Sequence, residues 1–342
     1  MSNTAIVYDP IFIKHDQPGH PESAKRLEAI MNKISDSGLI NKITQLKSRP
    51  ATIEEVKFCH SKDYIERVRE VCNTGGANLD PDTYTNKYSF DAAMVAVGSL
   101  IELTNAIING QIKNGFALLR PPGHHALKDR AMGFCIFGNV AVAAKVALQN
   151  NEIKKVAIVD IDVHHGNGTQ ALIEDNINIL YISTHQYPFY PGTGGLKEIG
   201  KGNCEGKLMN IPLPTYVGDN GFRTIYNETI IPKIEKFHPD ILFVSAGYDA
   251  HWDDPLANMG LSLSGYSWIS EELVKISDKL CDSKIVFTLE GGYNLESLSF
   301  GVVNSIRALL GLNDYDDPMG NSTYEEPDIN SLIKDLKKIH QL

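Results

Sequence analysis

Residues 156–170 read VAIVDIDVHHGNGTQ, a short apolar run that passes directly into a cluster of ionisable side chains. The apolar residues 156–159 are typical of a strand that a parallel sheet buries on both faces. Two aspartates and two histidines follow within six residues, and glycines come next. Because burying a charge without a partner is costly, this cluster at the end of a strand indicates a functional site.

Strand-like and helix-like stretches alternate along nearly the whole chain. The strand-like runs cover residues 5–8, 116–120, 155–161, 177–183, 241–247 and 284–290. Amphipathic stretches such as PESAKRLEAIMNKIS lie between them, TIEE at 52–55 predicts a capped helix start, and Gly110 and Gly311 stand where helices are expected to end. The alternation predicts an α/β fold with a mostly parallel sheet and helices on both faces. Since no linker rich in Pro, Gly or Ser interrupts it, we expect one domain over residues 1–342.

The composition is typical of a soluble globular protein. A formal net charge of −10 argues against direct nucleic-acid binding through a general basic surface. The five cysteines are scattered and form no CxxC pair, which favours a reducing compartment over a disulfide framework or a thiolate metal site. The opening residues MSNTAIVYDP show no secretory signal, and the most apolar helical stretch, 92–108, is too short to cross a bilayer. We therefore expect a cytoplasmic protein that does not enter membranes; its oligomeric state stays open.

Long irregular segments follow several of the expected strands. Residues 72–88, 120–139, 185–207 and 248–263 are too long for simple connections, and such loops usually carry function. Ligands of open parallel sheets bind beyond the carboxyl ends of the strands. The polar clusters in these segments are therefore expected to meet at one edge of the sheet.

Two of these clusters suggest a metal site. In the extended segment DIDVHH, the alternate residues Asp160, Asp162 and His164 share a face, and the last two form a natural ligand pair. SAGYDAHWDDP supplies Asp249, a third ligand that leaves a coordination position open, as in catalytic zinc sites. The same ligands could hold Fe(II) or Co(II). The alternative is a helix-capping aspartate, incidental histidines and a turn-forming Asp249.

Two further clusters suggest proton transfer. RPPGHHALKDRAMGFC places His124 and His125 after a tight turn, and a histidine pair suits taking a proton from water and giving one to an amine. LEGGYN presents Tyr293 after two glycines that allow a sharp bend, as a hydroxyl donor for a developing oxyanion. A surface turn with idle histidines and a half-buried tyrosine are the alternatives. Together the clusters indicate metal-dependent hydrolysis.

The ordered motifs PGHH, GFC, DxDxHHG, GYDAHxxDP and EGGYN resemble the zinc-dependent deacetylase family, which includes histone deacetylases and acetylpolyamine amidohydrolases. The resemblance runs from GHPESAKR near residue 20 to EGGYN near residue 290, and EGGYN is nearer to the class II and bacterial branch. It implies the three-layer α-β-α arginase/deacetylase fold, with a central, mostly parallel sheet of about eight strands. It also implies a metal-dependent amidohydrolase that acts on linear N-acetyl amides.

The resemblance carries specific roles onto this sequence. The implied zinc ligands are Asp162, His164 and Asp249. The implied catalytic groups are His124 with Asp160, His125 with Asn167, and Tyr293. The implied substrate-binding residues are Gly133, Phe134, Tyr190 and Leu256, with Asp82 in the loop at the entrance. A structural potassium site would use Asp160, Asp162, Ser183 and the main-chain carbonyls of His164 and Thr184, and Arg26 would lie near the acetate exit.

The two histidines are expected to differ in charge. An anionic neighbour raises the proton affinity of His124, whereas the amide of Asn167 does so much less for His125. We therefore expect His125 to be the principal proton carrier and His124 to act mainly through its charge.

The substrate is the least determined feature. Leu256 stands where polyamine-specialised relatives have an acidic residue, which favours acetyl-lysine in proteins or peptides. Against this, the overall acidity, Asp253, Asp254, Asp80 and Asp82 favour small cationic acetylamines such as acetylpolyamines.

Two other readings are less favoured. An arginase-like binuclear enzyme would need carboxylates where this chain has Gly166 and His251. A non-catalytic acetyl-amide binding module would be expected to lack His124, His125 or Tyr293, and all three are present.

Overall fold

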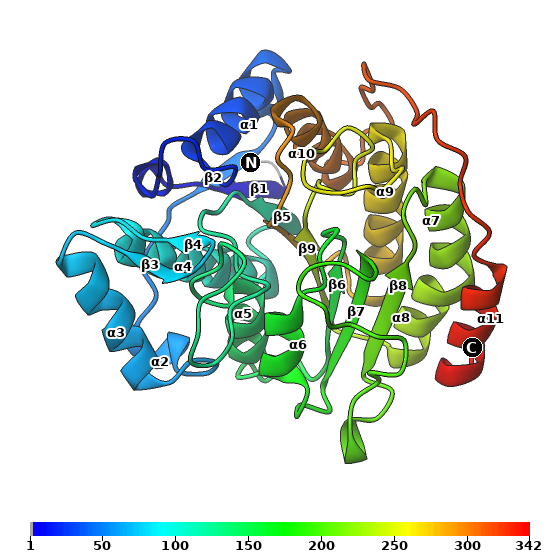
Figure 1. Ribbon diagram of the computed structural model, residues 1–342, viewed down its shortest axis with the longest axis horizontal. Coiled ribbons are helices and arrows are strands. Elements are labelled where there is room, and N and C mark those ends of the chain that lie inside the picture. The colour runs from blue at the N-terminus through cyan, green and yellow to red at the C-terminus, as the bar shows by residue number, and fades with distance from the viewer. Residues whose placement is uncertain (1–2) are drawn as a thin grey trace.

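The computed structural model describes residues 3–342, and a single eight-stranded sheet forms its centre (Figure 1). Every pair of neighbouring strands in this sheet is parallel. In sheet order the strands are β2 (Thr44–Leu46), β1 (Thr4–Val7), β5 (Asn114–Ala117), β10 (Ile285–Leu289), β9 (Ile241–Ala246), β6 (Val156–Asp160), β7 (Ile179–Gln186) and β8 (Leu208–Leu213). A small antiparallel pair, β3 (Asn78–Asp80) and β4 (Thr83–Tyr84), stands apart.

Helices cover both faces of the sheet, so the molecule has the predicted three layers (Figure 1). Helices α1, α10, α9 and α7 line one face, and α4, α5 and α6 line the other. The helices are α1 (Ala24–Asp36), α2 (Ile53–Val56), α3 (Lys62–Asn73), α4 (Ser89–Ile108), α5 (Asn139–Ala147), α6 (Asn167–Ile173), α7 (Asp219–Ile225), α8 (Ile231–Phe237), α9 (Leu263–Leu280), α10 (Leu295–Leu309) and α11 (Asn330–His340), with the short helices η1 (Pro10–Lys14), η2 (Leu39–Asn41), η3 (Gly202–Cys204) and η4 (Tyr226–Ile230).

All six strands that the sequence predicts are present in the eight-stranded sheet. The two strands of this sheet that it missed form the edges, and the short pair β3 and β4 was also missed. β2 has three residues, none of them fully buried, so it lacks a long apolar run. β8 contains Pro212, which is tolerated at an edge because a missing N–H there breaks no internal ladder. The predicted capping box at Thr52 and Glu55 is formed, and Gly110 and Gly311 follow the ends of α4 and α10 with positive φ.

The prediction for the most apolar helix was wrong in its length. Helix α4 has 20 residues, so within residues 3–342 it is the one helix long and apolar enough to cross a membrane by length and composition. Its most apolar window is 78% buried within the fold, as in the core helices of soluble proteins. Packing between α3, α5 and the sheet therefore explains its composition.

The strand order brings the predicted site segments together. β10, β9 and β6 are adjacent at the centre of the sheet, and β5 is the next strand beyond β10. Asp160, Ser245 and Thr288 are in register across the three central strands, so the loops that follow leave the sheet at the same edge. These loops contain the segments DVHHG, GYDAH and EGGYN.

Candidate active site

Three potential metal ligands meet where β6 and β9 end. His164 Nδ1 lies 3.1 Å from Asp162 Oδ1 and 3.3 Å from Asp249 Oδ2. One ligand atom from each of the three residues lies within 4.8 Å of the other two. All three side chains are nearly or fully withdrawn from solvent.

Backbone donors fix the two carboxylates. Asp162 Oδ2 accepts a hydrogen bond from Gly291 N at 2.8 Å, and Asp249 Oδ1 accepts one from Val163 N at 2.8 Å. The glycine is required, because a Cβ at residue 291 would lie 2.1 Å from Asp249 Oδ2. The loop after β10 therefore approaches both carboxylates closely enough to set their orientation.

The donor set fits a divalent metal ion. Asp249 Oδ2 is buried and makes no hydrogen bond to the described residues. Burial alone would lower the pKa of His164, but Asp162 and Asp249 outweigh it and raise that pKa to about 10, so the cluster attracts a cation. Two carboxylates and one imidazole match a catalytic zinc site, which takes three protein ligands and keeps one position open.

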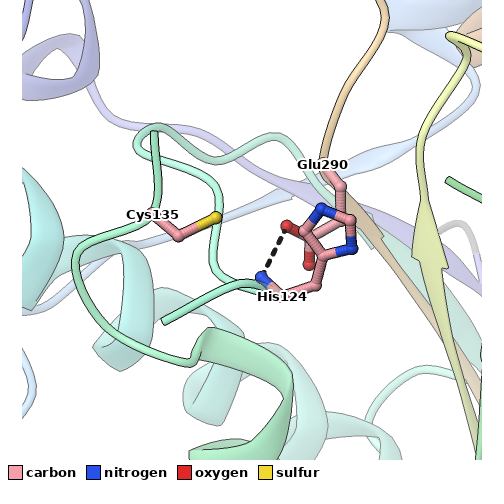
Figure 2. A group of neighbouring side chains, drawn as sticks. All are labelled: His124, Cys135 and Glu290. Atoms are coloured by element: carbon pink, nitrogen blue, oxygen red, sulfur yellow. Dashed lines mark hydrogen bonds between the residues drawn. The ribbon is translucent and has the colours of Figure 1, made fainter. Parts of the chain in front are cut away.

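A second cluster near the first contains His124, Cys135 and Glu290 (Figure 2). The Glu290 carboxylate accepts hydrogen bonds from the backbone N–H groups of His124 at 3.2 Å and Gly123 at 2.7 Å, and from the Ser245 hydroxyl at 3.2 Å. Burial and the charge of Glu290 raise the pKa of the Cys135 thiol well above its ordinary value. A protonated thiol is a poor metal ligand, and the carboxylate already has partners, so this cluster does not suit a metal ion.

His124 and His125 each contact the partner that was predicted for them. His124 Nδ1 lies 3.2 Å from Asp160 Oδ2, and His125 Nδ1 lies 2.8 Å from Asn167 Oδ1. Burial lowers both pKa values, but Asp162 and Asp160 reverse this for His124 and raise its pKa well above 6.5. For His125 burial dominates, the charges of His124 and His164 add to it, and the pKa is well below 6.5. One ring is therefore cationic and its neighbour neutral at pH 7.

A narrow pocket of about 90 Å³ opens onto this cluster. Its lining includes every residue predicted to bind substrate: Asp82, Gly133, Phe134, Tyr190 and Leu256, together with His125, His164 and Tyr293. The rings of Phe134 and Tyr293 are 5.9 Å apart, and those of His125 and Tyr190 are 5.2 Å apart.

The Gly133 turn is shaped by its neighbours. Gly133 and Phe134 both have positive φ, and a Cβ on Gly133 would lie 2.3 Å from the His125 ring. Asp82 Oδ1 accepts from Gly133 N at 3.2 Å, and Thr83 Oγ1 accepts from Phe134 N at 3.1 Å. The loop that joins β3 to β4 therefore supports one wall of the pocket.

The backbone of Tyr293 is held by Asp254, a residue that was expected from the sequence to attract cationic substrates. Asp254 is 6% exposed, and its Oδ2 accepts hydrogen bonds from Tyr293 N at 2.7 Å and Asn294 N at 3.2 Å. Its Oδ1 accepts from Leu256 N at 2.9 Å. The expectation that Asp254 attracts cationic substrates was wrong, because its carboxylate is buried against backbone donors. The neighbouring Asp253 is exposed.

Arg26 lies behind Tyr293 and does not line the pocket. It is fully buried and donates to the carbonyls of Gly292 at 2.7 Å and Glu290 at 2.6 Å. Its guanidinium lies 5.1 Å from the centre of the Tyr293 ring. It therefore braces the EGGYN turn from inside the fold.

The residues predicted to hold potassium lie where β6 ends and at the neighbouring part of β7. Asp160 and Ser183 face each other across the two strands. Asp160 Oδ1 accepts from Asp162 N at 3.2 Å, and the Ser183 hydroxyl lies 2.9 Å from His185 Nδ1. The oxygen-rich composition of this group suits a hard cation.

Sequence reasoning missed three supporting residues. Glu290 stands in the quoted EGGYN motif, directly after a strand, which was a usable signal. Phe189 stacks on His164 with ring centres 5.5 Å apart, and Asp254 holds two backbone segments. Nothing in the local sequence of these last two residues distinguishes them from ordinary loop residues.

Comparisons with known proteins identify the family of this chain. Residues 20–309 match the histone deacetylase domain. The chloroplastic histone deacetylase 14 of Arabidopsis thaliana is 39% identical, over 96% of this chain and 82% of its own length. A probable deacetylase of Archaeoglobus fulgidus is 37% identical, over 91% of this chain and 87% of its own.

A solved structure has the same architecture. The crystal structure of the HDA15 HD domain matches with a TM-score of 0.90 and 36% identity, covering 99% of this chain and 94% of that one. The eight-stranded parallel sheet flanked by helices is therefore the arginase/deacetylase fold. The chain belongs to the histone deacetylase family of hydrolytic deacetylases.

Proposed function

We propose that this deacetylase is zinc-dependent and hydrolyses the N-acetyl amide of acetyl-lysine in proteins or peptides, releasing acetate and a free amine. One observation carries the proposal: the cluster of Asp162, His164 and Asp249 lies beside a narrow pocket lined by His125 and Tyr293. A pocket of this shape suits a linear chain that ends in a small acyl group.

Asp162, His164 and Asp249 would hold the zinc ion, which would supply an electrophile for the acetyl carbonyl and the attacking water. His125 is neutral and its Nδ1 is bonded to Asn167, so Nε2 is the atom available to accept the water proton. Tyr293 keeps its proton because burial raises its pKa, and its hydroxyl donates to the developing oxyanion. The cationic His124 stabilises the same charge, and the imidazolium of His125 protonates the departing amine.

Removal and return of the metal ion test the cofactor. Acetate release from an acetyl-lysine peptide should vanish after chelation and return with Zn²⁺, Fe²⁺ or Co²⁺, of which Zn²⁺ is the ion we propose. Asp249→Asn should lose this recovery and also the thermal stabilisation that the ion gives to the metal-free protein. Asp253→Asn, an exposed neighbour, is the matched control. Full activity in metal-free protein contradicts the proposal.

The second candidate substrate is a small acetylated amine such as an acetylpolyamine, and the acidic Asp82 in the pocket lining favours it. Leu256, also in the lining, favours acetyl-lysine, because a second ammonium gains little beside leucine. The Tyr190 hydroxyl adds a polar edge where the family more often has phenylalanine. Values of kcat/KM for an acetyl-lysine peptide and an acetylated diamine, measured side by side, decide between them.

A non-catalytic binding module is the remaining reading. It predicts zinc-loaded protein that binds acetyl-lysine peptide without producing acetate. The neutral His125 beside the ligand cluster favours turnover instead.

We also propose that potassium occupies the group of Asp160, Asp162, Ser183 and the carbonyls of His164 and Thr184 as a structural ion. Its position at the end of β6, opposite Ser183 of the neighbouring β7, would couple it to the adjacent candidate metal ligands. Potassium should raise the melting temperature more than sodium at equal ionic strength.

Residues 1–342 are proposed to act as one deacetylase domain, although residues 1 and 2 lie outside the described residues. The continuous apolar core supports this. All five cysteines are buried and unpaired, which supports a reducing compartment such as the cytoplasm.

A further inference from the structure

The amino ends of β6 and β8 border a second cavity, of about 430 Å³, that has no part in the proposed chemistry. Lys155 precedes β6, whose other end carries the active-site residue Asp160, so the two sites lie at opposite edges of the sheet. Helices α8 and α11 form the outer walls, and Figure 1 shows α11, in red, beside the C-terminal label. The cavity lies within the size range of small-molecule sites.

Four lysines converge on this cavity in a protein of net charge −10. They are Lys155, Lys207, Lys233 and Lys236. Within residues 3–342, none of them forms an ion pair with a carboxylate, and Glu205 is the one acidic residue in the lining. The cavity therefore concentrates unneutralised positive charge.

Lys233 gives the clearest sign of an absent partner. The residue is 8% exposed, and its ammonium has a single hydrogen-bond partner among the described residues, His340 Nδ1 at 3.3 Å. Burial and the charges of Lys236 and Lys207 lower its pKa to about 8. A buried ammonium with three donors and one acceptor is costly unless an anion completes its shell.

The other lysines are held in place around the same space. Lys236 Nζ donates to the Gln341 carbonyl at 3.0 Å, and Lys155 Nζ donates to the Phe237 carbonyl at 3.0 Å. Lys207 and Lys155 lie 4.7 and 5.4 Å from the centre of the Phe237 ring. Lys155 and Lys236 each use one ammonium donor in these contacts, so their other donors are available to a ligand. The contacts also bring like charges together, and a bound anion would stabilise that arrangement.

We propose that this cavity binds a small molecule that carries phosphate groups. Lysine ammonium groups are common phosphate ligands, and four of them match an anion of several charges better than a single carboxylate. Leu180, Ile199 and Ile339 supply an apolar wall for the uncharged part of the molecule. The concave shape favours a small ligand over an extended nucleic acid.

Calorimetric titration tests the proposal. The full chain is titrated with inorganic pyrophosphate at fixed ionic strength, and sodium chloride is the reference salt. Saturable binding of one pyrophosphate per chain is expected. The double variant Lys155→Gln/Lys207→Gln should bind about a hundredfold more weakly, since each lost charged hydrogen bond costs about tenfold. Lys25→Gln/Lys42→Gln removes the same charge from exposed, unpaired lysines elsewhere and should bind like the wild type.

Lys233→Met provides a second variant that keeps the side-chain volume and removes the buried charge. It should fold, as judged by its circular dichroism spectrum, and lose pyrophosphate binding. The proposal is overturned if the wild type gives no saturable signal, or if the control double variant weakens binding as much as the cavity variant. Unchanged binding by Lys233→Met overturns it equally.

Discussion

At the scale of single residues, the adjacent His124 and His125 have opposite protonation states because their partners differ. Asp160 and Asp162 surround the first ring, while the second faces the neutral amide of Asn167 and the cationic His124. A neutral imidazole can accept a proton from water, and a neighbouring cation can stabilise the negative charge that develops. These partners were predicted from the resemblance to the deacetylase family, because the spacing in DIDVHH points to neither His124 nor Asn167.

The first prediction separates the two histidines. His125→Ala should lower kcat by about a thousandfold, because it removes the group that accepts and returns the proton. His124→Ala should cost less, because it removes a charge and not a proton carrier. Steady-state acetate release measures both. Near-full turnover of His125→Ala, with loss of activity in His124→Ala, contradicts the assignment.

The second prediction concerns the partner of His125. Asn167→Asp places a carboxylate 2.8 Å from His125 Nδ1 and should raise the pKa of that imidazole. The ring then becomes protonated at a higher pH, so the acidic limb of the kcat/KM profile should shift upward by about one pH unit or more. Asn178→Asp adds the same charge at an exposed position and should leave the limb unchanged. An unshifted limb in Asn167→Asp shows that another group controls it.

At the scale of elements, the central strands could be predicted because each is a buried apolar run. The cluster of Asp162, His164 and Asp249 could be predicted because its members follow such runs directly. The edge strands β2 and β8 could not, since exposure and Pro212 remove that signal. Contacts between loops were equally hidden. The hydrogen bond from Tyr293 N to Asp254 joins positions 39 residues apart, and no local pattern records it.

The third prediction tests that contact between the loops after β9 and β10. Asp254→Ala leaves three backbone N–H groups without their acceptor, which should cost about 2 kcal/mol of unfolding free energy. Displacement of Tyr293 should also lower kcat by about tenfold or more, with a smaller change in KM. Asp254→Asn keeps one carbonyl acceptor and should recover part of both losses.

The control for this variant is Asp253→Ala, which removes an exposed carboxylate from the same loop. Asp253 Oδ2 accepts a hydrogen bond from Asn294 Nδ2 at 2.9 Å but, unlike Asp254, none from the backbone of Tyr293. Urea unfolding and steady-state kinetics should show small changes for it. Equal losses in the two variants would show that the loop tolerates no alteration and that Asp254 has no particular positioning role.

The fourth prediction concerns helix α4, which contacts the segment before α2. Gly98 lies under that segment, and a Cβ there would stand 2.2 Å from the Arg49 carbonyl and 2.4 Å from Ala51 N. Ala51 N donates to the Met94 carbonyl at 2.7 Å, so the segment cannot easily move away. Gly98→Ala should therefore destabilise the protein by about 2 kcal/mol or more, although alanine favours a helix by about 1 kcal/mol.

Asn105→Ala, a partly exposed site on the same helix, is the comparison for helix propensity alone. It should stabilise the protein slightly, by a few tenths of a kcal/mol. Chemical denaturation of both variants measures the difference. If Gly98→Ala is as stable as the wild type, the close approach of the two segments is incorrect.

At the scale of the whole molecule, charged side chains gather at both ends of the parallel strands. Carboxylates gather at the carboxyl edge around Asp162 and Asp249, and unpaired lysines gather at the amino edge. The carboxylates were predictable because they directly follow apolar runs that are typical of buried strands. The lysines were not, because Lys155 and Lys236 are distant in sequence and only the packing of α8 against the sheet joins them.

The stability of the whole molecule should depend on pH through histidines that are buried in the neutral form. Burial lowers the pKa of five histidines to about 3 or 4: His15, His60, His185, His251 and His340. The unfolded chain binds protons on these rings below pH 6.5, and the folded chain does so only near pH 4. Stability is therefore lost as the pH falls between these values. Several groups with raised pKa values act in the opposite direction and reduce the net loss. Burial raises the pKa of Glu290 and Asp254 to about 7 and that of Asp82 to about 6, and nearby carboxylates raise the pKa values of His124 and His164.

His60 isolates this effect in the fifth prediction. Its Nε2 accepts a hydrogen bond from Gly138 N at 2.9 Å, and its Nδ1 lies 3.3 Å from the Lys128 carbonyl, so the neutral ring satisfies both neighbours. As the pH falls from 6.5 to 5, proton uptake by His60 in the unfolded chain should lower the free energy of unfolding by about 1.5 kcal/mol. His60→Gln keeps an acceptor for Gly138 and cannot titrate, so it should lose that much less over the same interval. His238→Gln, at an exposed position, should follow the wild type, and urea unfolding at the two pH values compares all three proteins. Equal pH dependence in the wild type and His60→Gln would mean that this ring does not take up a proton on unfolding, and the acid sensitivity would have to arise elsewhere.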